Sequence, residues 1–296
     1  MHINNINLSK KILTWYDNNK RTLPWRISPK SKRSQYYRIL SEFMLQQTQV
    51  KTVIPYFNRF VKEVPNLKSL SNTGEKKVLK LWEGLGYYRR AKNLRKSAKI
   101  LRKVYKNKIP DSFDKIKKLP GVGDYTANIL LALIYNQPRI GVDGNVKRVY
   151  ERLCRKKAKE NNLVNNFFFN KSTLNNRNAD FAEALMEFGA IICKPKNPNC
   201  NTCNLKNYCK FFKNKNLVLE KEKHIKKEKK YNVFCYLKKK GKKIALKRNK
   251  NVSFLKNFYL PEIQNSIFKD AKIKKNRWIY LSSFTNNISN IKMSIN

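Results

Sequence analysis

Four of the six cysteines lie close together between positions 193 and 209, and this cluster constrains the chain more than any other feature. The spacing is C-x6-C-x2-C-x5-C, over Cys193, Cys200, Cys203 and Cys209. In a reducing compartment such a cluster indicates a metal site rather than a set of disulfides. Four thiolates brought together by short loops can ligate a [4Fe–4S] cluster. Zinc is the main alternative, although it usually uses paired C-x2-C motifs and only one such pair occurs here.

The chain before the cysteines is predicted to be mostly helical. Apolar residues recur at helical spacing directly before the cluster, at Phe181, Leu185, Phe188 and Ile192. Further helices are expected over 37–49, 75–82 and 91–105 and after Asp143, with a first helix capped by Ser9.

The composition changes after the cysteines. Residues 213–230 carry many charges and little periodicity, which indicates a linker. Beyond it, YNVFCYL and KKIALKR alternate in polarity around KKKGK, which predicts a hairpin with Gly241 in the turn. We therefore expect a helical domain over 1–212 and a small strand-rich domain over 231–296.

The segment LPGVGDYTANIL, at 119–130, has the form of a helix-hairpin-helix. Its glycines, Gly121 and Gly123, allow a tight turn around Val122 and expose consecutive backbone N–H groups. The helix that follows points its positive end to the same place. This combination holds a DNA phosphate without reading base sequence.

Two carboxylates are distinguished by their neighbours. Glu42 shares a predicted helix face with Ile39 and Phe43, so burial should raise its pKa and favour a protonated form that can donate. An exposed Glu paired with a lysine is the ordinary alternative. Asp143, in GVDGNVKRV, is well placed to cap the next helix, which is the usual role of such an Asp.

The net charge of +47 favours a polyanionic partner. AT-rich codons also inflate Lys, Asn and Ile, so charge alone makes nucleic-acid binding only a favoured reading. Apolar runs fall short of the ~18–20 residues that cross a bilayer, and the N-terminus has no features of a signal peptide. A soluble, intracellular protein that does not bind membranes is expected.

Several segments together resemble the adenine DNA glycosylases, the MutY type of the helix-hairpin-helix superfamily. These are LPWR (23–26), SEFMLQQTQV (41–50), LWEGLGYYRRAKNL (81–94), LPGVGDYTAN (119–128), VDGNVKRV (142–149) and the cysteine cluster. The resemblance implies a mostly helical fold in which a six-helix barrel, about 24–135, packs on an iron–sulfur module formed by 1–23 and 136–212. The active site would lie between them.

The resemblance also implies residue roles. Glu42 would protonate adenine, and Asp143 would stabilise positive charge on the sugar as the glycosidic bond breaks. The remaining positions match residues that line the adenine pocket (Trp25, Arg26, Tyr125, Glu183), enter the stack around the opposite base (Gln47, Tyr87), bind DNA (Gly121, Val122, Gly123, Lys147) or hold the [4Fe–4S] cluster (Cys193, Cys200, Cys203, Cys209).

The residue at 125 separates branches of the superfamily. Endonuclease III-like lyases resemble LPGVGRKTA, with Lys there as Schiff-base nucleophile, whereas Tyr125 has no amine. A monofunctional adenine glycosylase is predicted. A thymine–guanine mismatch glycosylase, which also carries Tyr there, is the nearest alternative, and a non-catalytic iron–sulfur DNA-binding protein is a third.

The last domain resembles the α+β, Nudix-like module that recognises 8-oxoguanine in this family. FLKNFYLPEI, at 254–263, loosely matches one of its segments, and Ile288-Ser289-Asn290 falls where the family has Phe-Ser-His. Ser289 would then contact the damaged base. The implied partner is double-stranded DNA with A:8-oxoG or A:G mispairs, bound by a monomer in the bacterial cytoplasm, at the nucleoid.

Overall fold

The computed structural model describes residues 5–28, 30–158, 161–168, 174, 176–213, 229–236, 239–240, 243–248, 259–266, 282–288 and 291–295. The chain divides into two compact units, Met1–Val218 and Leu219–Asn296. In the part of the chain that is described, no helix is both long enough and apolar enough to span a membrane.

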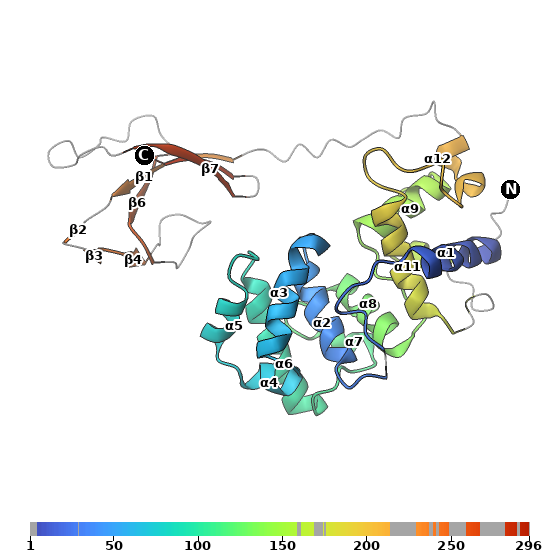
Figure 1. Cartoon of the computed structure of the whole chain (residues 1–296), viewed down its shortest axis with the longest axis horizontal. Helices are drawn as coiled ribbons and strands as arrows, with labels where there is room; N and C mark the ends of the chain where they lie inside the picture. The colour runs from blue at the N-terminus through green and yellow to red at the C-terminus, as the bar shows by residue number, and fades with distance from the viewer. Residues whose placement is uncertain are drawn as a thin grey trace. The chain divides into compact units, whose positions relative to one another are not determined.

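The first unit is helical (Figure 1). Its helices are α1 (Asn5–Asn19), α2 (Ser34–Leu45), α3 (Val50–Glu63), α4 (Leu67–Asn72), α5 (Glu75–Leu81), α6 (Arg89–Tyr105), α7 (Phe113–Lys117), α8 (Asp124–Tyr135), α9 (Gly144–Cys154), α10 (Asn161–Phe168), α11 (Asn178–Ile191) and α12 (Lys210–Lys213). A short 3-10 turn, η2, covers Lys206–Tyr208.

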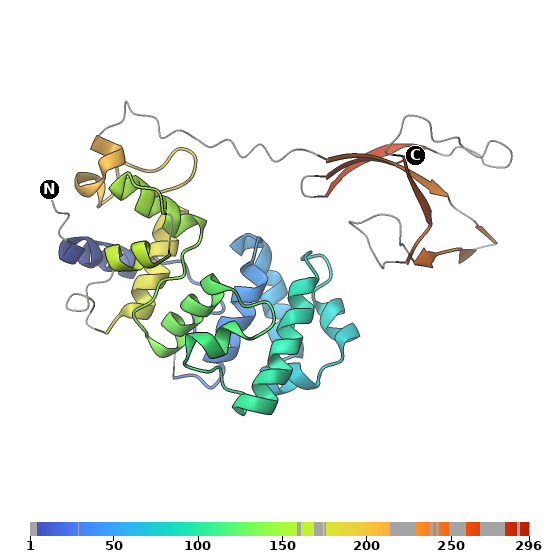
Figure 2. The same ribbon diagram turned by 180° about the vertical axis from the view of Figure 1, so that it is seen from behind.

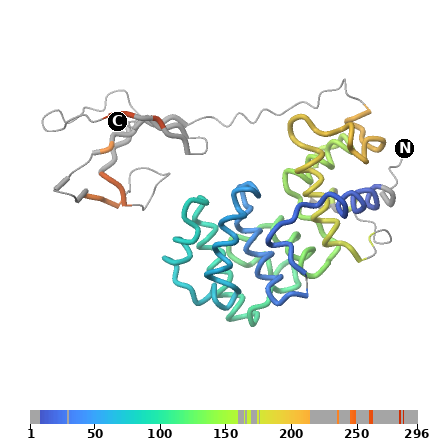
Figure 3. Tube along the Cα trace, viewed as in Figure 1, coloured from blue at the N-terminus to red at the C-terminus, as the bar shows by residue number. Residues whose placement is uncertain are grey.

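Two hydrophobic cores organise these helices. The first core draws its buried residues from Leu23 to Leu131, and so from α2 to α8. The second draws them from Leu8 to Tyr16 and from Ile140 to Leu205, and so from α1, α9, α10 and α11. The N-terminal helix α1 therefore lies beside α11, far from it in sequence, as both ribbon views and the trace show (Figures 2 and 3).

A small apolar contact joins the two cores. Ile129, Ala132 and Leu133 of α8 pack against Ala182 of α11, and all are buried. Because α8 leaves the helix-hairpin-helix turn and α11 leads to the cysteines, this contact fixes the two motifs relative to each other.

Two details of the helices differ from the sequence prediction. The helix expected over 37–49 ends at Leu45, and Gln47 takes a left-handed conformation with φ 58°. The carbonyls at this end accept hydrogen bonds from the distant Arg90, so no local breaker is needed. Ser9 lies inside α1 rather than at its cap, and its hydroxyl donates to the Phe168 carbonyl at 3.2 Å.

The second unit contains strands. A four-stranded sheet has the order β6-β1-β8-β7, from β1 (Lys229–Tyr236), β6 (Glu262–Ser266), β7 (Phe284–Ile288) and β8 (Ile291–Ile295). Strand β1 runs antiparallel to β6 and parallel to β8. Two small pairs join β2 (Lys239–Lys240) to β3 (Lys243–Ile244) and β4 (Lys247–Arg248) to β5 (Tyr259–Leu260).

The hairpin predicted from sequence is only partly correct. The short strands β2 and β3 pair antiparallel, whereas residues 231–236 lie in β1 and pair with β6 and β8. Gly241, predicted for the turn, lies outside the described residues. The segments 214–228, within the predicted linker, and 289–290, with Ser289, are outside the described residues.

Candidate active site and cysteine cavity

A cleft of about 900 Å³ lies in the helical unit and is lined from both cores. It collects the two carboxylates that the sequence singled out and the four residues expected to line the adenine pocket, together with several residues that the sequence did not indicate. Its walls include Trp25, Arg26, Arg38, Glu42, Gln46, Gln47, Tyr125, Asp143, Asn145, Glu183, Met186 and Glu187.

Glu42 lies on α2 within this cleft and is only 5% exposed. Burial raises its pKa to about 7, and this effect exceeds the opposing ones of a hydrogen bond from Tyr125 and the nearby charge of Arg38. Its Oε2 atom has no hydrogen-bond partner in the structure. A carboxyl with this pKa is about half protonated near neutral pH, and its unpartnered oxygen makes no competing hydrogen bond within the protein.

Asp143 is the N-cap of α9. Its Oδ1 accepts from the backbone N–H groups of Asn145 at 2.9 Å and Val146 at 2.7 Å, and its Oδ2 accepts from the Asn145 side chain at 2.9 Å. Burial raises the pKa of Asp143, while these hydrogen bonds and Arg148 act in the opposite direction. The cap predicted from sequence is present, and the same carboxylate lines the cleft.

A row of paired charges crosses the floor of the cleft. Arg38 and Arg26 both pair with Glu183, and Arg26 and Arg21 both pair with Glu187. The Tyr16 hydroxyl also donates to Glu183. Although burial opposes ionisation of Glu187, Arg21 and Arg26 lower its pKa to about 2, so it is anionic at neutral pH.

Sequence inspection missed Arg38, Glu187 and Tyr16. The available signal was helical spacing, because Arg38 precedes Glu42 by one turn and Glu187 follows Glu183 by one turn. Trp25 is buried and packs edge-to-face on Phe57 at 5.3 Å, so it forms a rigid wall beside this row.

Tyr125 closes the cleft near Glu42. Its hydroxyl donates to Glu42 and lies 3.5 Å from the Met186 sulfur, and burial raises its pKa well above the usual value. The neutral phenol can therefore orient Glu42 at any pH near neutral, but it supplies no amine.

The helix-hairpin-helix turn has the expected backbone. Gly121 has φ +83°, and a Cβ there would lie 2.9 Å from atoms of Asn93 and Phe43. The turn continues directly into α8, whose first residues therefore present free N–H groups. Lys147 lies on α9, where its half-exposed amine is 3.9 Å from Glu151.

Gln47 and Tyr87 have unusual backbone conformations for residues other than glycine. Their φ angles are 58° and 49°, and both side chains are exposed, Tyr87 by 51%. Large exposed aromatic side chains are rare in the described residues, and such a residue in a strained turn indicates a contact surface.

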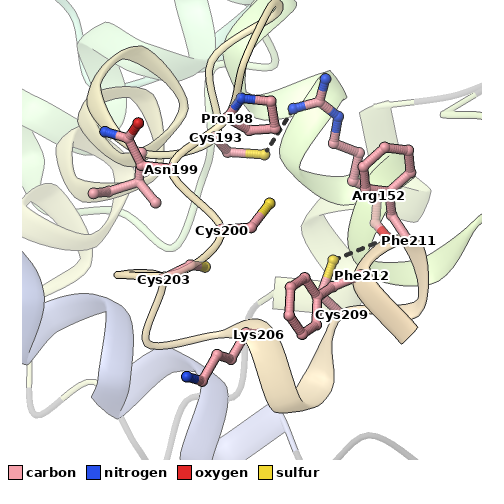
Figure 4. A pocket seen from close by; sticks show the side chains of 11 residues that line it. Arg152, Cys193, Pro198, Asn199, Cys200, Cys203, Lys206, Cys209, Phe211 and Phe212 are labelled. Carbon is pink, nitrogen blue, oxygen red and sulfur yellow. Dashed lines mark hydrogen bonds between the residues drawn. The ribbon is translucent and has the colours of Figure 1, made fainter. Parts of the chain in front are cut away.

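The four clustered cysteines line one hollow at the end of α11 (Figure 4). Burial raises the pKa of Cys203 to about 11 and also raises that of Cys209. Arg152 lies over the Phe211 ring, and its Nη1 is 3.4 Å from the Cys193 sulfur.

A chain of hydrogen bonds connects this hollow to the cleft. Arg148 donates from Nε to the Cys193 carbonyl at 2.7 Å and from Nη2 to the Asn145 side chain at 2.7 Å. Asn145 in turn donates to Asp143. One arginine therefore holds both the first cysteine and the cap of α9.

Comparison with known proteins identifies the family. Residues 40–168 match the model of the HhH-GPD superfamily base excision DNA repair proteins. The adenine DNA glycosylase of Buchnera aphidicola subsp. Baizongia pistaciae is 38% identical over 306 residues, which cover 96% of this chain and 83% of the relative. The chain belongs to the adenine DNA glycosylases.

The resemblance inferred from sequence is therefore confirmed, as is a mostly helical helix-hairpin-helix fold. The enzyme of Schizosaccharomyces pombe is 36% identical over 71% of this chain and 50% of the relative. The human enzyme is 36% identical over 67% of this chain and 38% of the relative. This family member is thus a DNA glycosylase of base excision repair, which hydrolyses the N-glycosidic bond of adenine in DNA.

Solved structures agree on the fold of the helical unit. A thermostable thymine-DNA glycosylase superposes with a TM-score of 0.61 at 24% identity, covering 71% of this chain and 96% of that one. Endonuclease III, trapped in a covalent intermediate with DNA, superposes with a TM-score of 0.59 at 19% identity, covering 73% of this chain and 100% of that one.

The Gly121 turn provides a first prediction. Gly121→Ala places a Cβ against Asn93 and Phe43 in a left-handed conformation that costs roughly 1–2 kcal/mol. We expect the affinity for duplex DNA, measured by fluorescence anisotropy at fixed salt, to fall about tenfold. Gly74→Ala, at the N-cap of α5, is the matched control, because no atom lies within 4 Å of its Cβ position and the residue has no proposed DNA contact. Equal affinities for both variants would contradict a phosphate-binding turn.

Proposed function

We propose that this glycosylase excises adenine opposite 8-oxoguanine or guanine, with Glu42 as acid and Asp143 as the stabilising anion. One observation carries the assignment. Both carboxylates line the same cleft, one buried with a pKa near 7 and the other held by three hydrogen bonds. Two carboxylates in different environments are suited to different roles in breaking a glycosidic bond.

Glu42 would act on the leaving base. Adenine is a poor leaving group until it is protonated, and the base must first be turned out of the duplex to reach the cleft. The Oε2 atom of Glu42 has no protein partner and would deliver the proton. Tyr125 would orient the carboxyl through their hydrogen bond.

Asp143 would act on the sugar. Bond cleavage leaves an oxocarbenium-like ring, and a fixed carboxylate beside it lowers the energy of that charge. The backbone amides of α9 hold Asp143 in place before the substrate arrives. Because Tyr125 offers no amine, we expect water to complete the reaction without strand cleavage.

The charged row would form the adenine pocket. Trp25 supplies a flat apolar wall, while Arg26 and Glu183 present a donor and an acceptor whose positions are fixed by mutual ion pairing. Such a pocket can bind a planar base through one face and its polar edge. Gln47 and Tyr87, whose side chains are exposed, would enter the base stack around the base opposite adenine. Lys147 and the Gly121–Gly123 turn would contact phosphates of the DNA. The enzyme would bind the DNA as a monomer.

The cysteine hollow fits a [4Fe–4S] cluster held by Cys193, Cys200, Cys203 and Cys209. Four thiols from one short loop line this common hollow, which supports a shared metal centre. The cluster would supply the bonds that fix the loop.

We assign the second unit to a Nudix-like module that contributes to the recognition of 8-oxoguanine. Its mixed four-stranded sheet is compatible with such a module. Ser289, the proposed contact, lies outside the described residues. Since a neutral hydrogen bond contributes only ~1 kcal/mol, its effect on preference would be modest.

The substrate assignment is tested by one recombinant protein on four duplexes, A:8-oxoG, A:G, T:G and A:T. We expect single-turnover release of adenine from the first two, faster opposite 8-oxoguanine, and little reaction on the others. If thymine were released from T:G at a rate comparable to that of adenine release, the protein would instead be assigned as a thymine–guanine mismatch glycosylase.

The role of Glu42 predicts a pH profile. An acid must be protonated, so kcat/KM for adenine release should fall as pH rises through about 7. Glu42→Gln keeps the shape without a proton to donate, and should lose ~10² or more in rate together with this pH dependence, while mismatch binding persists. Glu63→Gln, on the exposed face of α3, is the matched control. Normal excision by Glu42→Gln would end the assignment.

The cluster is tested by metal analysis of purified protein. We expect about four irons per chain and a brown colour. Cys200→Ser should lose iron and lower the melting temperature, because the loop depends on the metal. Cys235→Ser, in the second unit, should keep its iron. Colourless protein with one zinc per chain would favour a zinc site instead.

A further inference from the structure

Arg90, in the first turn of α6, makes an unusual set of contacts for a buried arginine. It is 7% exposed, and its guanidinium donates to five backbone carbonyls. Three belong to the end of α2 and two to the loop before α6, with distances of 3.2 Å to Phe43, 2.7 Å to Met44, 3.4 Å to Leu85 and 3.1 Å to Gly86, and a short contact to Gln46.

The two segments that Arg90 connects are those that carry Gln47 and Tyr87. Each segment leaves regular structure through a left-handed residue, at φ 58° for Gln47 and φ 49° for Tyr87. Gly86, directly before Tyr87, has φ 76°. Left-handed backbone is unfavourable for residues with a Cβ, so these turns persist only where other contacts hold them.

Arg90 also lies against the aromatic side chains of the second segment. Its guanidinium carbon is 5.4 Å from the centre of the Tyr87 ring and 5.5 Å from that of Trp82. The Trp82 indole donates to the Gly86 carbonyl at 3.1 Å. The inner face of Tyr87 is therefore supported, while half of the side chain stays exposed.

We propose that Arg90 is a positioning residue that holds Gln47 and Tyr87 together as a preformed wedge for opening the base stack. The proposal rests on the proposed function, which assigns these two side chains to the stack. A side chain that must displace a stacked base is more effective when its conformation is fixed before binding, since ordering it later would oppose insertion.

The chemistry of arginine explains why this position needs more than a positive charge. A guanidinium carries five donors in a rigid plane and can reach two segments at once. A lysine keeps the charge, but its single ammonium group cannot reproduce the fork. Arg90→Lys is therefore the informative substitution, and Arg89→Lys at the exposed neighbour is its matched control.

The experiment compares adenine release from an A:8-oxoG duplex with release of the same adenine placed in a bubble of mismatched bases. A wedge is needed only where stacked pairs must be opened. Arg90→Lys should be slowed about tenfold on the duplex and less than about twofold on the bubble, a difference set by a few lost hydrogen bonds. Arg89→Lys should match the wild type on both. Equal slowing on both substrates would show a structural role alone and overturn the proposal.

If Arg90→Lys does not fold, a second variant tests the proposal. Gly86→Ala alters the backbone preference of the Tyr87 segment, and its Cβ would meet no atom within 4 Å. It should show the same loss on the duplex only. Combining Arg90→Lys with Tyr87→Ala should slow the duplex reaction no more than Tyr87→Ala alone. Additive losses would mean that Arg90 does not act through Tyr87.

A binding readout separates this proposal from the proposed catalysis. 2-Aminopurine beside the mispair fluoresces more strongly when its stack is opened, whether or not adenine is released. At saturating protein, binding of the wild type should raise the fluorescence, whereas binding of Arg90→Lys should not. If this difference is seen but the wild type releases no adenine, the catalytic assignment is rejected and the wedge is supported. An equal rise with both proteins would overturn the wedge.

Discussion

The row of alternating charges beneath the cleft is the interaction on which the site depends. Arg38, Glu183, Arg26, Glu187 and Arg21 come from α2, α11 and the segment after α1, so their ion pairs connect elements of both cores. Buried charges are unfavourable unless each has a partner, and here the partners lie across the cleft. The row therefore specifies one arrangement of the two cores around the cleft, whether or not it adds to the net free energy of folding.

The same arrangement explains why Glu42 differs from its neighbours. Glu183 and Glu187 each face two arginines, whereas Glu42 has only a tyrosine donor and the more distant charge of Arg38. A carboxyl that is buried without a full ionic partner keeps its proton to higher pH. Because the arginines pair with Glu183 and Glu187, Glu42 is left without an ion pair of its own.

The sequence was sufficient for features that depend on local pattern. The cap at Asp143, the Gly121 turn and the burial of Glu42 follow from neighbours within one or two helical turns. Sequence patterns did not predict features that depend on a residue far away in the chain. The end of α2 is set by Arg90, more than forty positions away, and β1 pairs with β6 and β8 rather than with the next strand. Ion pairs such as Arg38–Glu183 likewise leave no local pattern beyond helical spacing.

The Asp143 cap and the cysteine loop are parts of one packed region. Arg148 donates to the Cys193 and Gly189 carbonyls and to Asn145, which itself donates to Asp143. Gly189 permits this close approach, because a Cβ there would lie 2.7 Å from that of Asn145. Any movement of the loop after α11 would therefore shift the start of α9. A metal cluster that fixes this loop would therefore also fix the Asp143 carboxylate, and so would support the role proposed for Asp143 in catalysis without contacting the substrate.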